Sequence, residues 1–583
     1  MKRKADRSRS YRSTGGAGGF ARWGSGLTLC LMALSALAQT PFNPTDQQEQ
    51  RERAERQAQE RAQRQALPEV RGGETASESQ YTDTQLPQET PCFQLDRLVL
   101  EGAVEHRARF GFAQHYLNQY QGRCVGQAGI GLIVRRVSDL ILARGYVTSR
   151  VGLPEQNLAD GTLRLQLIPG TIGAIRFADE DGMPARIWRS AFPARPGQLL
   201  NLRDLEQGLE QLKRVPSQDA TMEIVPGDGV GQSDVVIMLV TQRRWRGSVS
   251  FDDSGSRATG KPQVNANLGV DNLAGRNDLL ALGISSDGSA EAGRGTHGYN
   301  ASYSIPWGNW RIGAGVNGYR YRQTMRGAVQ DFSASGRSRS TDLTIERLLK
   351  RGQHYRSGVE LRIGQRQARS YIENVEVRNQ RRRTTSLELA LLHRQYWGPA
   401  QIDLRLAHRR GVPWLGGDDD ASGTPSDYPT YRYALTTLDA SLMRPVPLGV
   451  RQALWNSALR YQWSDDPLYG SEFISIGGRY TVNGYDGETT LGGARGGYWR
   501  NSLSLPLHRA FVPYVGIDVG HIESDRQLGI EGGTLSGGHI GFRGDAAGAV
   551  TWDAFVGWPI DGPRGYRQRS DARAYGLRVA YQF

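Results

Sequence analysis

Few residues in this sequence have the types and the spacing that enzyme chemistry requires. It contains no G-x-x-x-x-G-K-[ST] run for binding phosphates, no H-E-x-x-H run for zinc and no G-x-S-x-G run for a nucleophilic serine. The G-x-G-x-x-G match formed by Gly313, Gly315 and Gly318 is followed by strand-like residues and not by the helix that a dinucleotide site needs. We therefore predict that the protein is not an enzyme and has no catalytic residue, metal site or cofactor.

The first 38 residues have the layout of a secretory signal peptide. Residues 1–26 are basic and polar, residues 27–37 are mostly apolar, and Ala36, Leu37 and Ala38 have the small-x-small form that a signal peptidase accepts. The apolar stretch is too short for a permanent transmembrane helix. We predict that the chain is exported and that cleavage after Ala38 removes residues 1–38.

Export determines the chemistry expected of the cysteines. Cys30 leaves with the signal peptide, whereas Cys92 and Cys124 remain in the mature chain. An even pair in an oxidising compartment predicts a disulfide between Cys92 and Cys124, with two free or buried thiols as the alternative. Because neither cysteine belongs to a C-x-x-C pair or accompanies paired histidines, no zinc site is predicted there.

The overall composition narrows the class of protein. Of the 583 residues, 73 are glycine and 9% are aromatic. This composition excludes a disordered chain. Because the glycines have no three-residue period, collagen is excluded as well, and a turn-rich β architecture is favoured. A mean hydropathy of −0.53 and the lack of an apolar run of ~18 residues exclude a helical membrane protein, but membrane barrel strands would escape that test.

The charge gives no sign of a nucleic-acid partner. The net charge of +13 is smaller in the mature chain, because the predicted signal peptide contains seven basic residues and one acidic residue. No dense cluster of lysine and arginine interleaved with aromatic residues follows it, so we predict no binding of nucleic acid.

The mature chain begins with a polar helix at residues 39–66 and a linker at residues 67–91. The helical run at residues 47–65 lacks Gly, Pro and β-branched residues, and Glu49 precedes Arg53 by four positions, which is a favourable helical pair. Its apolar residues are alanines, so it has no stripe for joining a hydrophobic core and must be solvated or lodged in a polar space. The linker is rich in Pro, Gly, Ser, Thr and Glu, which predicts flexibility.

Two small α/β units are predicted next, over residues 92–169 and 170–243. In the first unit, apolar residues between 130 and 141 have the i, i+3, i+4, i+7 spacing of a helix with one buried face, and residues 162–168 alternate as a half-buried strand does. The same order of strands and helices recurs in the second unit, where Asn201 is placed to cap a helix with a leucine face. We therefore predict two tandem domains.

From residue 244 to residue 583 the helical periodicity stops and alternating segments replace it. Tyr581 and Phe583 end a segment, 574–583, in which apolar or aromatic residues alternate with small or polar ones. On an exported chain, this pattern is typical of an outer-membrane barrel strand, with one face toward lipid and the other toward a polar lumen. A secreted β-sandwich would alternate in the same way and is the alternative.

The order of these parts resembles the transporters of two-partner secretion, the TpsB family, of the haemolysin secretion and activation type. The resemblance covers almost all of the mature chain, and its most specific segments are residues 251–256 (FDDSGS), 476–488 (IGGRYTVNGYDGE) and 513–520 (PYVGIDVG). The cysteine pair and the terminal Phe583 fit as well. The resemblance implies a mostly β fold, in which the N-terminal helix plugs a barrel of about sixteen strands. It also implies that the two small units are POTRA domains in the periplasm of a Gram-negative bacterium, with the barrel in the outer membrane.

One motif departs from the family pattern. The family usually carries Val-Arg-Gly-Tyr or Val-Arg-Gly-Phe at the tip of a loop folded back into the barrel. This chain has, at the same place, Val482, Asn483, Gly484 and Tyr485. The resemblance implies that the family arginine pairs with an acidic residue of the barrel wall, and the matching strand of this chain contains Asp518 and Gly520.

The replacement of arginine weakens the expected anchor of the loop. Asn483 can still hydrogen-bond with Asp518, but a charge-assisted, bidentate contact is lost. We hypothesise that Arg479, four residues earlier, substitutes for the missing charge. This hypothesis is wrong if Arg479→Ala leaves both barrel stability and secretion unchanged.

These features predict a secretion pore that uses no nucleotide. Such a transporter would bind an unfolded client at the strand edges of its small domains and offer it a wet path through the barrel. The expected partners are a large secreted exoprotein encoded nearby, of the haemolysin, adhesin or contact-dependent toxin type, outer-membrane lipid, and the barrel assembly machinery during biogenesis. Assembly of other outer-membrane barrels is the alternative function, and a passive porin would leave the two small domains unexplained.

Overall fold

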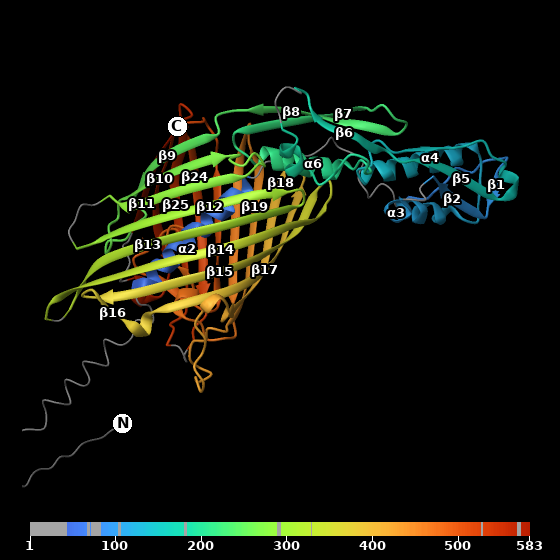
Figure 1. The fold of residues 1–583 in the computed structure, drawn as a ribbon. Coiled ribbons are helices and arrows are strands. Elements are labelled where there is room, and N and C mark those ends of the chain that lie inside the picture. The colour runs from blue at the N-terminus through green and yellow to red at the C-terminus, as the bar shows by residue number, and fades with distance from the viewer. Residues whose placement is uncertain are drawn as a thin grey trace, which may run out of the picture.

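The protein consists of a barrel, two small domains beside one end of it and a helix inside it (Figure 1). The computed structural model describes residues 44–66, 70, 83–102, 106–179, 184–288, 293–327, 329–525, 529–567 and 573–583. The predicted signal peptide and most of the predicted linker lie outside the described residues. The barrel end that carries the small domains is called the domain end here, and the opposite end the far end.

Sixteen long antiparallel strands of the described residues close into a barrel, as predicted. Each strand pairs with its neighbours in chain order, and β27 (Ala574–Gln582) closes the barrel by pairing with β9 (Trp245–Asp252). A two-residue strand, β16 (Val375–Glu376), extends the hairpin after β15. The other long strands are β10 (Gln263–Asp271), β11 (Leu279–Asp287), β12 (Gly295–Trp307), β13 (Trp310–Arg326), β14 (Asp331–Arg351), β15 (Tyr355–Ile372), β17 (Arg382–Trp397), β18 (Ala400–Val412), β19 (Ala434–Leu448), β20 (Arg451–Trp463), β23 (Gly496–Ser504), β24 (Val512–Ile522), β25 (Gly533–Ala546) and β26 (Val550–Asp561).

The outer surface of the barrel is apolar because alternate side chains of each strand point outward. Ile284 on β11 and Leu577 on β27 are exposed, whereas Glu388 on β17 and Asp439 on β19 are buried on the inner side. Strands with lipid on one face and a polar lumen on the other have this pattern. In the part of the chain that the structure describes, no helix has the length and apolar character needed to cross a membrane.

The first small domain packs two helices against a three-stranded sheet of order β2–β5–β4. Leu163 and Leu165 on β5 and Ile133 on α4 are fully buried in its core, as their spacing predicts. Its elements are β1 (Phe93–Leu95), β2 (Arg97–Glu101), α3 (Arg107–Leu117), β3 (Arg123–Val125), α4 (Gln127–Ala143), β4 (Arg150–Gly152) and β5 (Thr162–Ile168).

The second small domain repeats this design with a sheet of order β6–β8–β7. The side chain of Asn201 accepts a hydrogen bond from the backbone N–H of Arg203 at 2.9 Å and so caps α6. Leu205 and Leu212 of α6 are fully buried in the core. The elements are β6 (Thr171–Phe177), α5 (Arg186–Ala191), α6 (Leu202–Lys213), β7 (Gln218–Pro226) and β8 (Gln232–Thr241).

Two segments occupy the barrel lumen. One is α2 (Pro44–Gln65), which runs from the far end toward the domain end (Figure 1). The other is the loop between β20 and β23. It contains the short turn η7 (Gly470–Glu472) and a two-stranded ribbon of β21 (Ile474–Ile476) and β22 (Leu491–Gly493). Apolar residues of this loop form a third core cluster, to which Tyr566 of the short helix α7 (Arg564–Arg567) also belongs.

Candidate functional site

The far-end part of α2 is held by polar contacts with the barrel wall. The Oγ1 atom of Thr45 lies 2.7 Å from the Oη atom of Tyr321 and 2.7 Å from the Oγ atom of Ser370. Arg382 on β17 donates a hydrogen bond to Asp46 at 2.9 Å. Thr45 and Asp46 are both almost completely buried. Because all of these groups can also hydrogen-bond with water, the contacts can be exchanged when the helix moves.

A chain of ion pairs lines the barrel wall beside α2. Glu472, at the end of η7, lies 2.9 Å from Arg366 on β15 and 3.4 Å from Arg409 on β18. Glu388 on β17 continues the chain, with Arg409 at 2.7 Å and Arg405 at 2.5 Å. All five side chains are partly or fully buried, so each charge is stabilised by its partners in this series of ion pairs.

Helix α2 joins this chain as an additional partner. Arg53 lies 3.8 Å from Glu472, and Glu49 lies 3.5 Å from Arg366. Glu472 and Arg366 also pair directly with each other. Glu472 of the loop and Arg366 of the wall would therefore each keep an ionic partner without α2.

The tip of the second segment is anchored at Asp518 on β24, which is 1% exposed. The backbone N–H of Asn483, and not its side chain, donates to Asp518 at 2.9 Å. The Oδ1 atom of Asn483 instead accepts from the N–H of Gly484 at 3.0 Å. Tyr485 donates from its hydroxyl to the carbonyl of Asp561 at 2.6 Å. The loop tip is thus held by main-chain groups of the loop and the barrel.

The positive charge nearest to Asp518 comes from the barrel wall. Arg500 on β23 is the direct cross-strand neighbour of Asp518, and its Nε atom lies 3.4 Å from the carboxylate. Arg479, the residue that the sequence suggested as a substitute, instead pairs with Asp253 at 3.0 Å. The structure therefore brings Asn483 and Asp518 together but places Arg479 at another carboxylate. Arg500 was missed because its position beside Asp518 depends on strand register.

Glycines let the loop tip approach the wall closely. A Cβ atom on Gly520 would lie 2.8 Å from the side chain of Val482, and one on Gly537 only 2.1 Å from the carbonyl oxygen of Asn483. Gly484 itself has a φ of +120°, a conformation that favours glycine. Gly520 was expected from the sequence motif, whereas the role of Gly537 depends on a contact that no local pattern reveals.

Comparison with known proteins identifies the family. The family model described as haemolysin secretion/activation protein ShlB/FhaC/HecB matches residues 231–544. Models of a ShlB-type POTRA domain and of a POTRA domain match residues 93–170 and 171–226. The chain belongs to this family of two-partner secretion transporters.

Individual relatives match most of the length of this chain, and their names describe transporters. The chain is 39% identical over 563 residues to the outer membrane transporter CdiB-2 of Burkholderia pseudomallei, covering 92% of this chain and 95% of the relative. It is 26% identical to the hemolysin transporter protein ShlB of Serratia marcescens, covering 75% and 77% of the two chains. Among solved structures, CdiB from Escherichia coli matches with a TM-score of 0.80 and 27% identity, over 94% of this chain and 100% of that chain. CdiB from Acinetobacter baumannii matches over 94% and 100% with a TM-score of 0.82 at 23% identity, which supports the fold alone.

Membership of this family orients the transporter. The barrel lies in the outer membrane, and the two POTRA domains lie in the periplasm. The domain end is therefore the periplasmic end of the barrel, and the far end is the extracellular end. The buried residues of α2 all lie in its extracellular half, and its periplasmic half makes further contacts such as the hydrogen bond from Arg61 to the hydroxyl of Tyr498 at 2.9 Å.

The second POTRA domain of the transporter is docked on the periplasmic rim through α6. Arg351, at the end of β14, donates to Glu210 at 2.6 Å and to Gln207 at 3.1 Å. It also donates to the carbonyl of Val70 at 2.8 Å, which ties the linker to the same place. Burial disfavours the Glu210 carboxylate, but the positive charges of Arg356 and Arg351 outweigh this effect and lower its pKa below the usual value.

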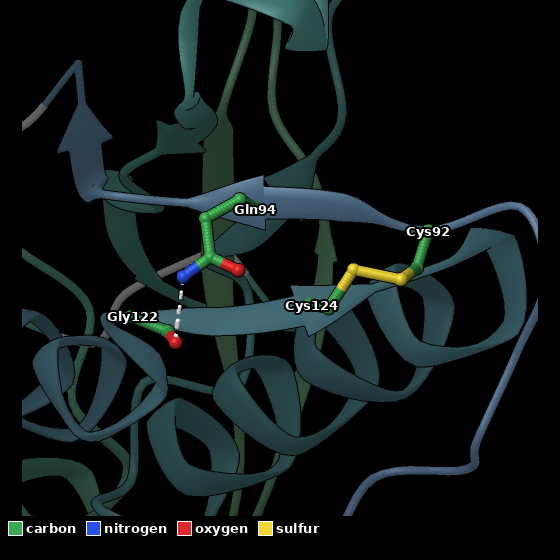
Figure 2. Close-up of a disulfide and its surroundings, with 4 residues drawn as sticks. All are labelled: Cys92, Gln94, Gly122 and Cys124. Carbon is green, nitrogen blue, oxygen red and sulfur yellow. Dashed lines mark hydrogen bonds between the residues drawn. A yellow bond between two sulfur atoms is a disulfide. The ribbon is translucent and has the colours of Figure 1, made fainter.

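The cysteine pair lies in the first POTRA domain, away from the lumen. Figure 2 shows Cys92 and Cys124 joined by a disulfide beside the short pair of strands β1 and β3, with Cα atoms 5.4 Å apart. In the same ribbon, the side chain of Gln94 donates to the carbonyl of Gly122 at 2.8 Å. The bond links the start of the domain to the strand that precedes α4, so its role there is structural.

The C-terminal residues lie where the barrel closes. Backbone hydrogen bonds join Phe583 and Gly247 in both directions, at 3.0 Å and 2.9 Å. The ring of Phe583 stacks on Tyr581, with centroids 5.9 Å apart, and also contacts Trp245. The terminal aromatic residue, which directly follows β27, thus packs on the first strand of the barrel.

Proposed function

We propose that this transporter exports a large partner exoprotein of the haemolysin, adhesin or contact-dependent toxin type through its barrel lumen, without nucleotide hydrolysis. The observation that carries the proposal is α2, which occupies the lumen yet is held there by exchangeable polar contacts. In this proposal α2 closes the resting pore and must leave the lumen before the client passes. Folding of the client outside the cell then makes export one-way.

The POTRA domains receive the client first in this proposal. The sheet of each domain has two edge strands, β2 and β4 in the first domain and β6 and β7 in the second. An extended client segment can add to such an edge by main-chain hydrogen bonds, which requires no particular client sequence. The client would then pass from a POTRA edge to the periplasmic mouth of the barrel.

Two further partners belong to the proposal. Outer-membrane lipid would contact the apolar outer surface of the barrel, where side chains such as Ile284 and Leu577 are exposed. The barrel assembly machinery would act on the chain during biogenesis, with Tyr581 and Phe583 at the C-terminus as its signal.

The first test is secretion of an N-terminal fragment of a large exported protein encoded beside the transporter. We expect the fragment in the medium when the transporter is present, and in the periplasm when it is absent at matched expression. A fragment that stays in the periplasm in both cases would contradict the proposal. A fall in all outer-membrane proteins on depletion would then favour barrel assembly, a function that the transporter relatives do not favour.

The second test locks α2 in the lumen. Thr45→Cys and Ser370→Cys place sulfur atoms where the native Oγ1 and Oγ atoms are 2.7 Å apart, close enough for a disulfide without a large rearrangement. We expect oxidised double-cysteine protein to secrete nothing and to recover after reduction. Each single-cysteine variant is the matched control. Unimpeded secretion by the oxidised double variant would show that α2 does not need to leave.

A further inference from the structure

The periplasmic half of α2 has open space beside it. One cavity, of about 590 Å³, lies between α2 on one side and, on the other, the folded-in loop and the wall strands β9, β20 and β23 to β27. A second, of about 700 Å³, extends from Arg64 to α6 of the second POTRA domain. Arg61 lines both, so the two cavities meet at this residue. Each has the volume of a ligand site, roughly 300–1,000 Å³.

Basic side chains outnumber acidic ones in the lining of both cavities. Five arginines and three aspartates line the first cavity. Ten basic and six acidic side chains line the second. A cavity with low-dielectric walls and an excess of one charge concentrates ligands of the opposite charge. Both cavities therefore favour acidic occupants over basic ones.

Two arginines line the second cavity, one beside the end of α2 and the other at the end of α6. Arg394 is 3% exposed and binds Asp403 through Nε at 2.5 Å and the carbonyl of Arg64, at the end of α2, through Nη2. The Nε atom of Arg214, at the end of α6, has no hydrogen-bond partner among the described residues. A buried donor without an acceptor is unfavourable, so a carboxylate that reached the Nε atom of Arg214 would be bound.

From these observations we infer that the cavities bind an acidic, extended segment of the exported protein while α2 is still in the lumen. This inference rests on the proposed function and names the chemistry of the segment that enters first. The contacts of Thr45 and Asp46 lie at the other end of α2, so entry beside the periplasmic half leaves them intact. Client entry then precedes release of α2.

The test uses the full-length transporter in detergent and two short fluorescent peptides. One peptide contains glutamate, serine and glycine, and the other has lysine in place of glutamate. Fluorescence anisotropy is measured with the wild type and with oxidised Thr45→Cys/Ser370→Cys protein. We expect the acidic peptide to bind both proteins, more weakly at high salt, and the basic peptide to bind neither. Equal binding of the two peptides, or loss of binding on locking, would overturn the inference.

A substitution tests whether the acidic peptide binds in the second cavity. Arg394→Gln should weaken binding of the acidic peptide about tenfold, because it removes a charged donor from the cavity. Arg432→Gln is the matched control, since Arg432 is 61% exposed and pairs with Asp419 outside both cavities. An unchanged affinity for Arg394→Gln, or an equal loss for Arg432→Gln, would place the peptide elsewhere. Heat-dependent migration in gels checks that each variant barrel has folded.

Alkylation of an engineered cysteine provides a second test if the Arg394→Gln variant does not fold. Ala62 lines the first cavity, so the thiol of Ala62→Cys can be alkylated from the lumen. We expect the acidic peptide to slow this alkylation by occupying the cavity. Faster alkylation would mean that the peptide expels α2, which overturns the inference. Secretion by the locked protein would refute the proposed function instead, whatever the peptide result.

Discussion

Helix α2 and the folded-in loop occupy the same lumen but are attached by different forces. The buried residues of α2 are all polar: Thr45, Asp46, Glu49 and Gln50. The buried residues of the loop include apolar and aromatic side chains, with Val482 0% and Tyr485 1% exposed. The loop also meets the wall through glycines, backbone against backbone.

Under the proposed function, this difference separates a permanent part of the barrel from a removable one. Apolar burial and close packing are lost outright when a segment moves into water. Polar contacts are instead exchanged for hydrogen bonds with water, so each contributes little net free energy. We therefore expect changes at the loop to alter barrel stability, and changes at α2 to alter how long the plug stays in place.

The largest effect is expected from Gly537→Ala. The new Cβ atom would meet the carbonyl oxygen of Asn483 at 2.1 Å, and that oxygen belongs to backbone that cannot move without displacing the loop. We expect overpacking to lower the free energy of unfolding by about 3 kcal/mol, measured from denaturant titrations of the barrel. Gly364→Ala on β15 is the control, because its Cβ atom would have an ordinary 3.6 Å contact with Ser386. Equal stability of the two variants would show that the contact between the loop and the wall does not require a glycine at position 537.

Asp518→Ala should have the next largest effect. It leaves the N–H groups of Asn483 and Asn501 without their carboxylate acceptor, and we expect a loss of about 2 kcal/mol together with faster proteolysis of the loop. Arg500→Gln should cost less, because its contact with Asp518 is 3.4 Å long. A larger loss for Arg500→Gln than for Asp518→Ala would show that charge, and not main-chain donors, holds the loop.

Local patterns in the sequence predicted the elements but not the contacts between them. The period of two predicted barrel strands such as β27, and the helical spacing around Ile133 predicted α4, because each pattern depends on neighbours along the chain. The pairing of Arg500 with Asp518 depends on the register of β23 against β24, which no single strand encodes. For the same reason the sequence left α2 either solvated or lodged in a polar space, since the wall arginines that bind it come from separate strands.

The smallest effect on the barrel is expected from Asp46→Asn, a substitution that tests how firmly α2 is held in the lumen. The change weakens the charge-assisted contact with Arg382 but touches no strand pairing of the barrel. We expect barrel stability to stay within about 0.5 kcal/mol of the wild type. We also expect retention of α2 to weaken by about 1 kcal/mol, seen as roughly fivefold more frequent open events in planar bilayers. If Asp46→Asn instead destabilises the barrel as much as Asp518→Ala does, then α2 is part of the barrel core. Export would then have to proceed with the helix in place.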